Sequence, residues 1–415
     1  MRALLVVIHR WFGLGMALFL FQAGFTGALI AWDHELDALL FPELYEAAPG
    51  REPSELLPPL ELARTVEQND PRFSVTFLPL SVEPGATVKM GVRPKLDPAT
   101  QKPYELGFDE IGVDPTNGAV QARREWGKVS LSREQLMPFL YRLHYSLHLP
   151  DLSGVELGMW LMGVVALVWV LDAFIALWIS FPSLKSWRKS FAFRFDKGGY
   201  RLNFDLHRSG GVWAWLLLLP LAVTAVSMNL GNEIVRPVVS WFSPLSPSPF
   251  ATREAAAQAV VPSVDRQQVI ARALSEAERR GISEPAGGVF YSPDFGVYGV
   301  GFYTPGNDHG DGGLGNPWLY IDGKSGELAG ADLPGRGSAG DLFMQLQFPL
   351  HSGRILGVAG RVLITLLGLI VSMLSVTGVV IWARKRKVRV LAKAQEKRAE
   401  AAPAAGVHAG AEPTA

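Results

Sequence analysis

Histidines in this chain recur at matching places in its two halves. His9-Arg10 and His207-Arg208 each stand at the start of a long apolar run. Neutral imidazole is the commonest protein ligand for metals, and its second ring nitrogen can be oriented by a hydrogen bond. A histidine followed by an arginine at both positions therefore indicates an internal repeat whose two copies carry the same chemistry.

A second set of histidines lies further along each half. Turn sequences that end in Gly118 and Gly326 are each followed about 25 residues later by histidine. In the first half this is His144, with His148 four residues beyond it, and in the second half it is His351. Counting from the turn favours His144 as the counterpart of His351, whereas counting to the tryptophan that ends the following span favours His148. We prefer His144 and keep both as candidates.

The apolar residues are gathered into runs long enough to cross a membrane. Four runs exceed the roughly 18 apolar residues of a membrane span, at about 11–32, 155–181, 212–230 and 356–382. We interpret the first as an uncleaved anchor. Lysine and arginine are concentrated between the second and third runs and after the fourth, so these segments and both chain ends are expected in the cytoplasm.

This pattern predicts an α-helical integral membrane protein with four transmembrane helices from two repeated halves. Its segments are a first span (1–32), an outer lobe (33–153), a second span (154–181), a basic cytoplasmic loop (182–209), a third span (210–230), a second outer lobe (231–355), a fourth span (356–382) and a disordered cytoplasmic tail (383–415).

The two outer segments have the pattern of small α+β lobes. Each begins with a helical segment, near 60–70 and 265–280, followed by alternating strand-like segments separated by glycine and proline turns. In the first lobe, residues 132–149 read as a further helix that places His144 and His148 on one face.

The chain has no cysteine. Disulfides, iron–sulfur clusters and covalently attached haem are therefore excluded, and a cofactor has to be held by histidine, carboxylate or methionine. Nothing in the composition indicates a nucleic-acid partner.

If the halves are related by an axis along the membrane normal, His9 faces His207 and an outer histidine of the first half faces His351. Opposed imidazoles beside glycine-rich helices suit a b-type haem, so we predict two, one near each membrane surface. His148 and His34 are lower-ranked ligands. The arginines suited to pair with haem propionates are Arg10, Arg208, Arg354 and Arg361.

Two alternatives start from single residues. His144 and His148 could form half of a zinc site, because two histidines one helical turn apart suit zinc. A metal-ion permease would need ionisable groups inside the membrane, for which Asp172 is the chief candidate.

These residues resemble the PepSY-associated transmembrane family over nearly the whole chain. The resemblance is carried by six segments: His9–Gly27, Asp114–Gly118, Leu143-His144, Asp205–Arg208, Asp322–Gly326 and Pro349–Gly353. It implies a bacterial inner-membrane protein with two PepSY-like periplasmic lobes, similar to FoxB-like ferric-siderophore reductases.

The activity that the resemblance implies is that of a haem-dependent oxidoreductase. Electrons from a cytoplasmic or quinol donor would pass through two b haems to a ferric siderophore in the periplasm and release Fe(II). The rival expectation is a non-enzymatic membrane-anchored PepSY protein that regulates a periplasmic protease or assists siderophore uptake.

Overall fold

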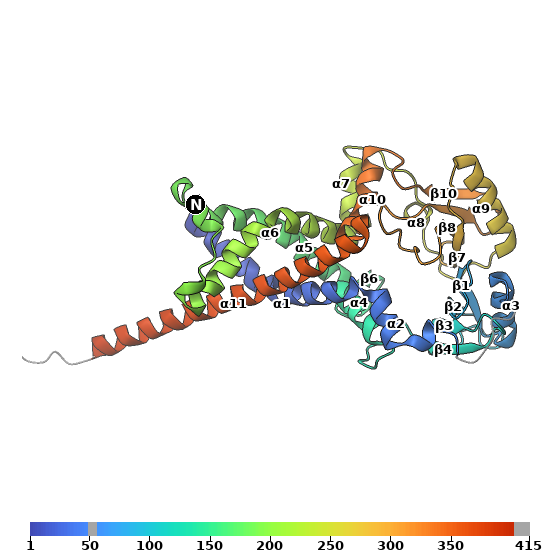
Figure 1. Ribbon diagram of the computed structural model, residues 1–415, viewed down its shortest axis with the longest axis horizontal. Coiled ribbons are helices and arrows are strands. Elements are labelled where there is room, and N and C mark those ends of the chain that lie inside the picture. Colours follow the sequence, from blue (N-terminus) through green and yellow to red (C-terminus); the bar gives the residue numbers. More distant parts are fainter. Residues whose placement is uncertain (49–55, 402–415) are drawn as a thin grey trace, which may run out of the picture.

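The computed structural model describes residues 1–48 and 56–401. Four long helices form a bundle that stands beside a β-sheet region (Figure 1): α1 (Arg2–Ile30), α5 (Leu157–Ser180), α6 (Gly199–Leu230) and α11 (Gly357–Ala401). All four are long and apolar enough to cross a membrane, which confirms the prediction of four such helices. We call the end of the bundle next to the sheet the sheet end. The opposite end, where α1 begins, is the tail end.

The bundle is drawn together where α1 crosses α11. A Cβ atom added to Gly24 would lie 2.6 Å from the carbonyl oxygen of Gly368, and one added to Gly368 would likewise meet the carbonyl oxygen of Gly24. Only glycine allows the two backbones to come this close, as is common between membrane helices. The crossing fixes α1 and α11 as neighbours through the middle of the bundle.

The strands of both predicted lobes form one antiparallel sheet of eight strands, in the order β10-β9-β8-β7-β1-β2-β3-β4. The first-half strands are β1 (Phe73–Pro79), β2 (Val88–Pro94), β3 (Glu110–Val113) and β4 (Val120–Arg124). The second-half strands are β7 (Ala286–Ser292), β8 (Val297–Phe302), β9 (Trp318–Asp322) and β10 (Leu328–Asp332). The two predicted outer lobes are joined into one layer, because β1 pairs with β7 at the centre of the sheet.

The sheet and its helices share one hydrophobic core. Helices α3 (Pro59–Asn69) and α9 (Arg266–Arg280) contribute their buried apolar faces to this core together with strands of both halves. Both helices confirm the helical segments predicted near 60–70 and 265–280. This continuous core joins the two halves of the sheet into one layer next to the bundle.

Short elements connect the bundle to the sheet (Figure 1). Those nearest the bundle are α2 (Asp33–Leu40), α4 (Leu136–Ser146), α10 (Ala339–Ser352) and the 3-10 turn η5 (Arg354–Leu356). The remaining elements are η1 (Pro42–Leu44), β5 (Asp151–Leu152), β6 (Val155–Glu156), η2 (Leu184–Ser190), η3 (Phe195–Lys197), η4 (Gly231–Val235), α7 (Arg236–Ser240) and α8 (Pro249–Thr252).

A buried ion cluster anchors α2 to the sheet. Arg124 of β4 pairs with Asp37 of α2 at 2.8 Å and with Glu110 of β3 at 2.7 Å. The side chains of Arg124 and Asp37 are 2% and 7% exposed, so each charge depends on the other for compensation. The first half of the sheet is thereby fixed to the helix that follows α1.

Two predicted boundaries differ from the structure. Helix α4 ends at Ser146 because Leu147 and His148 have positive φ, so His148 is not on the helical face of His144 as predicted. Helix α11 continues to Ala401, so the prediction of a disordered tail from residue 383 is wrong for residues 383–401. This stretch consists mainly of alanine, lysine, arginine, glutamate and leucine, which favour helix, and contains no proline. Residues 402–415 lie outside the described residues.

Candidate functional site

Four histidines face one another in two pairs, one toward each end of the bundle. At the tail end the ring centres of His9 (α1) and His207 (α6) are 6.1 Å apart. At the sheet end those of His144 (α4) and His351 (α10) are 6.2 Å apart. The structure therefore brings together both predicted pairs, and in the second it is His144 that faces His351.

Each histidine of the sheet-end pair is held by a threonine. Nδ1 of His144 lies 3.0 Å from the hydroxyl of Thr26 on α1, and Nδ1 of His351 lies 3.0 Å from the hydroxyl of Thr224 on α6. Both hydroxyls donate their single proton to a carbonyl one turn back in their own helix. Each hydroxyl must therefore accept a proton from Nδ1, which leaves the lone pair on Nε2.

The tail-end pair follows the same rule with different acceptors. Nδ1 of His9 lies 2.9 Å from a carboxylate oxygen of Asp172 on α5, and Nδ1 of His207 lies 2.9 Å from the carbonyl oxygen of Leu374 on α11. A backbone carbonyl oxygen and a carboxylate oxygen both act as acceptors, so Nδ1 donates in both pairs. Within the described residues, no Nε2 atom of the four histidines makes a hydrogen bond.

Glycines next to these acceptors make room for two of the rings. A Cβ atom at Gly27, beside Thr26, would lie 3.0 Å from Cε1 of His144. One at Gly378, beside Thr377, whose hydroxyl oxygen lies 3.2 Å from Nδ1 of His207, would lie 2.9 Å from Cε1 of His207. Since contacts this short displace one of the two groups, glycine is needed at both positions for the ring to reach its acceptor.

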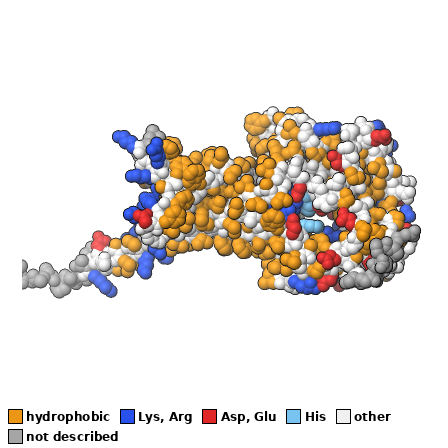
Figure 2. Space-filling view, in the orientation of Figure 1, with side chains coloured by type: hydrophobic (Ala, Val, Ile, Leu, Met, Phe, Trp, Pro, Cys, Tyr) orange, Lys and Arg blue, Asp and Glu red, His pale blue; other side chains and the backbone are white. Residues whose placement is uncertain are grey.

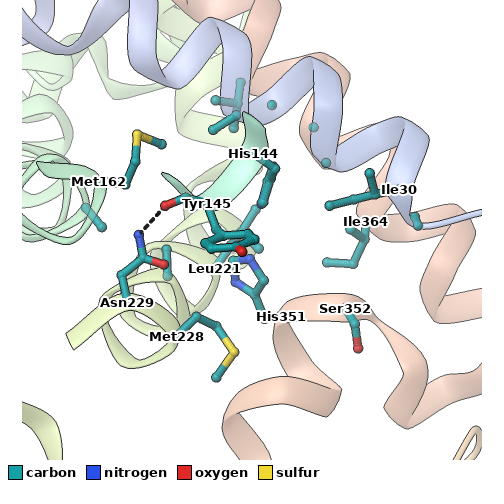
Figure 3. A pocket seen from close by; sticks show the side chains of 18 of the residues that line it. Ile30, His144, Tyr145, Met162, Leu221, Met228, Asn229, His351, Ser352 and Ile364 are labelled. Atoms are coloured by element: carbon teal, nitrogen blue, oxygen red, sulfur yellow. Dashed lines mark hydrogen bonds between the residues drawn. The ribbon is translucent and has the colours of Figure 1, made fainter. Parts of the chain in front are cut away.

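The sheet-end pair borders a cavity of about 310 Å³, within the size range of ligand sites. His144 and His351 approach the space from opposite sides, and apolar side chains stand around it (Figure 3). Residues that line the cavity include Trp169, Asp33, His309 and Arg354. Burial lowers the pKa of His144 to about 4, and burial together with the neighbouring His144 lowers the pKa of His351 to about 3. Both imidazoles are thus neutral at pH 7, the form that binds metals.

The spacing of both pairs fits one metal ion between two imidazoles. Metal–nitrogen bonds of about 2 Å and about 1 Å from nitrogen to ring centre place two opposed ring centres roughly 6 Å apart. Within the described residues there is no cluster of three or more His, Cys, Asp or Glu side chains that could hold a metal. The pairs therefore suit a metal whose other ligands come from a planar macrocycle, because a bare zinc ion takes four ligands.

Two of the arginines predicted to pair with haem propionates have an unpaired N–H donor at the tail end. The Nε atoms of Arg10 and Arg208 are buried and have no hydrogen-bond partner among the described residues. A buried donor without an acceptor is costly, and a carboxylate would satisfy it with a charge-assisted bond. Both positions fit the predicted propionate contacts.

The other two predicted arginines lie at the sheet end. Arg354 lines the cavity, where it pairs with Asp311 at 2.7 Å and with Asp33 at 3.3 Å. Arg361 is bound to Glu35 and to the carbonyl oxygen of Ala31. Arg354 is thus the one of the two that borders the site.

The lower-ranked histidines lie apart from the pairs. Nε2 of His148 donates to the carbonyl oxygen of Phe139, 2.9 Å away, and the His148 ring stacks on the Phe139 ring. His34 is exposed and makes an edge contact with Tyr45. Because His148 and His144 have different partners, the zinc site predicted from their spacing is not formed.

The site also contains residues that the sequence analysis did not select. His309, in the glycine-rich loop of residues 304–317, lines the cavity, and Gly312 N of that loop donates to Arg354 O at 2.8 Å. The loop is therefore seated on the sheet end of the bundle. Thr26 and Thr224 were also missed, although each follows the histidine of its own helix by 17 residues. That shared spacing was the available signal.

Comparison with known proteins identifies the family. A search of curated proteins finds no match. The model of the PepSY-associated TM region family matches residues 6–385, which include both histidine pairs, the sheet and most of the four long helices. The chain is a membrane protein that belongs to the PepSY-associated TM region family.

Proposed function

We propose that this protein is a haem-dependent oxidoreductase that carries electrons across the bacterial inner membrane to a ferric siderophore. The observation that supports it best is the orientation of the four imidazoles. Each has its Nδ1 fixed as a donor, so its Nε2 lone pair is free, and the rings are spaced for one iron atom per pair. Bound haem b would supply one-electron redox chemistry at each pair.

The separation of the pairs supports a conduit. His9 and Thr26, which mark the two pairs on α1, are 17 residues apart, or about 25 Å along the helix. This is close to the thickness of the bilayer hydrocarbon, about 30 Å. Trp169 lines the sheet-end cavity and lies only three residues, about 4.5 Å of helix, from Asp172 at the tail-end pair. The large aromatic side chain of Trp169 therefore lies on the stretch of α5 between the tail-end pair and the sheet-end cavity.

The distribution of charge supports the orientation. Figure 2 shows an apolar belt around the bundle and lysine and arginine gathered at the tail end. By the positive-inside rule this end is cytoplasmic, with both chain termini, and the sheet is periplasmic. We assign the two halves of the sheet as PepSY-like lobes of two repeated halves of the chain.

The ferric chelate would be reduced at the sheet end. The cavity wall there includes Asp33, His309 and Arg354, beneath the sheet. Figure 2 shows a hollow between bundle and sheet with histidine visible in it. An Fe(III) chelate in this hollow would accept one electron, and the Fe(II) formed would leave its siderophore. The electron donor, cytoplasmic or a quinol, is a separate partner.

The test is the spectrum of the purified protein from haem-replete cells. We expect b-haem absorption with two haems per chain that shifts on reduction with dithionite, and reoxidation on addition of a ferric siderophore. Replacing either His9 or His207 should remove the same haem, and replacing either His144 or His351 should remove the other. His34→Gln is the matched control and should retain both. A colourless preparation would reject the proposal in favour of a non-enzymatic PepSY protein.

A further inference from the structure

Asp172 is an ionisable side chain buried inside the membrane part of the bundle. It is 4% exposed and is the only charged residue of α5, between Leu157 and Ser180. A carboxylate at such a place is costly unless a specific partner compensates it, and it usually has a function. Its partner is His9, whose Nδ1 lies 3.0 and 2.9 Å from its two oxygens.

Asp172 is also the exception among the four groups that hold the histidines. His144 and His351 donate to the hydroxyls of Thr26 and Thr224, and His207 donates to the backbone carbonyl of Leu374, 2.9 Å away. These three acceptors are neutral. A neutral acceptor is therefore sufficient to orient an imidazole in this bundle, and orientation alone does not explain a buried carboxylate at His9.

A carboxylate acts on an axial imidazole in a way that a neutral acceptor does not. By accepting the Nδ1 proton it raises the electron donation of Nε2 to the metal. Its negative charge also favours the more positive, ferric state of an iron on the other side of the ring, and the low dielectric of the interior strengthens this effect. Hydrogen bonding to the ligand is one of the ways in which proteins set haem potentials.

We propose that Asp172 makes the tail-end centre at His9 and His207 the lower-potential of the two, and so directs electrons toward the sheet end. The inference rests on the proposed function. With haem bound at both pairs, an electron given up at His9 and His207 would be gained at His144 and His351. The ring spacings of the two pairs are similar, 6.1 and 6.2 Å, but only the tail-end pair has a carboxylate hydrogen-bonded to one of its imidazoles.

The experiment is a spectroscopic redox titration of the haem-loaded full chain and of Asp172→Asn. Asparagine keeps an oxygen that accepts the Nδ1 proton of His9 and removes only the charge. We expect the tail-end Fe(II)/Fe(III) ratio at a fixed ambient potential to rise about tenfold, which is about 59 mV for a one-electron couple. The sheet-end potential should not move. An unchanged or lowered tail-end potential would overturn the proposal, since a role limited to orientation predicts no shift.

A second measurement does not depend on that variant. His351→Leu removes the sheet-end centre, so the remaining midpoint in that protein identifies the tail-end centre in the wild-type titration. This midpoint must be the lower of the two, and the opposite order would refute the assignment. A chain with no redox-active chromophore contradicts the proposed function instead, whereas two haems with equal or reversed potentials contradict only the role of Asp172.

Discussion

Replacing Thr224 by valine tests whether the hydroxyl tether holds the sheet-end centre. Valine has nearly the shape of threonine, and the position is 2% exposed, so the change removes the acceptor of His351 without opening a cavity. A buried Nδ1–H left without an acceptor costs about 1–3 kcal/mol. At 1.4 kcal/mol per factor of ten, this predicts haem binding at the sheet end weaker by about fivefold to 150-fold. Loss of such partners at other metal sites typically costs 10–100-fold in affinity.

The assay is the haem content of the purified protein together with the rate at which haem passes to an excess of apomyoglobin. Thr224→Ser keeps the hydroxyl and should retain both haems. The tail-end centre should be unaffected in either variant, because His207 is 17 residues, about 25 Å of helix, from position 224. If the Thr224→Val protein held both haems as firmly as the wild type, or lost the tail-end haem, the hydrogen bond between His351 and Thr224 would not be what stabilises the sheet-end centre.

Three further changes test the scaffold. Arg124→Met removes the cation that compensates the buried carboxylate of Asp37 and should lower the free energy of unfolding by about 3–5 kcal/mol, seen as a lower unfolding midpoint in detergent. Arg133→Ala, in an exposed pair, should change the free energy of unfolding little. Gly368→Val places a side chain against the α1 backbone and should push α1 and α11 apart where they cross. We expect lower thermal stability and loss of the sheet-end haem. Normal thermal stability would show that the crossing can relax. Asp311→Asn weakens the ion pair between the glycine-rich loop and Arg354 and should speed proteolysis within residues 304–317. An unchanged cleavage rate would mean that the loop is held by its backbone contact with Arg354 alone.

The four spans and the pairing of histidines could be predicted because both depend on properties that are local in sequence. A membrane span is recognised by its length and hydropathy. The correspondence of His9 with His207 is visible because both begin apolar runs. The helices α3 and α9 were found for the same reason, since helical periodicity is read within a few residues.

The choice between His144 and His148 could not be made from spacing. It depends on where α4 ends, and the two residues after Ser146 leave the helix with positive φ. A helix ends within one or two residues, whereas a periodic sequence pattern can continue beyond that point. The joining of the two lobes has a similar cause. Strands β1 and β7 pair although more than 200 residues separate them, and no local pattern reports a contact of this kind.

Asp172 illustrates how a residue can be recognised as functional from sequence while its partner is not. As an isolated ionisable group in an apolar helix, it is the chief candidate for a permeation path. In the structure its carboxylate is instead bound to a histidine of another helix, as Thr224 is bound to His351. The residue that holds each imidazole comes from a different helix, so only the packing of the bundle identifies it. A duplicated sequence therefore predicts equivalent ligands, but it does not predict equivalent centres, because the groups that hold the ligands are free to differ between the two ends of the bundle.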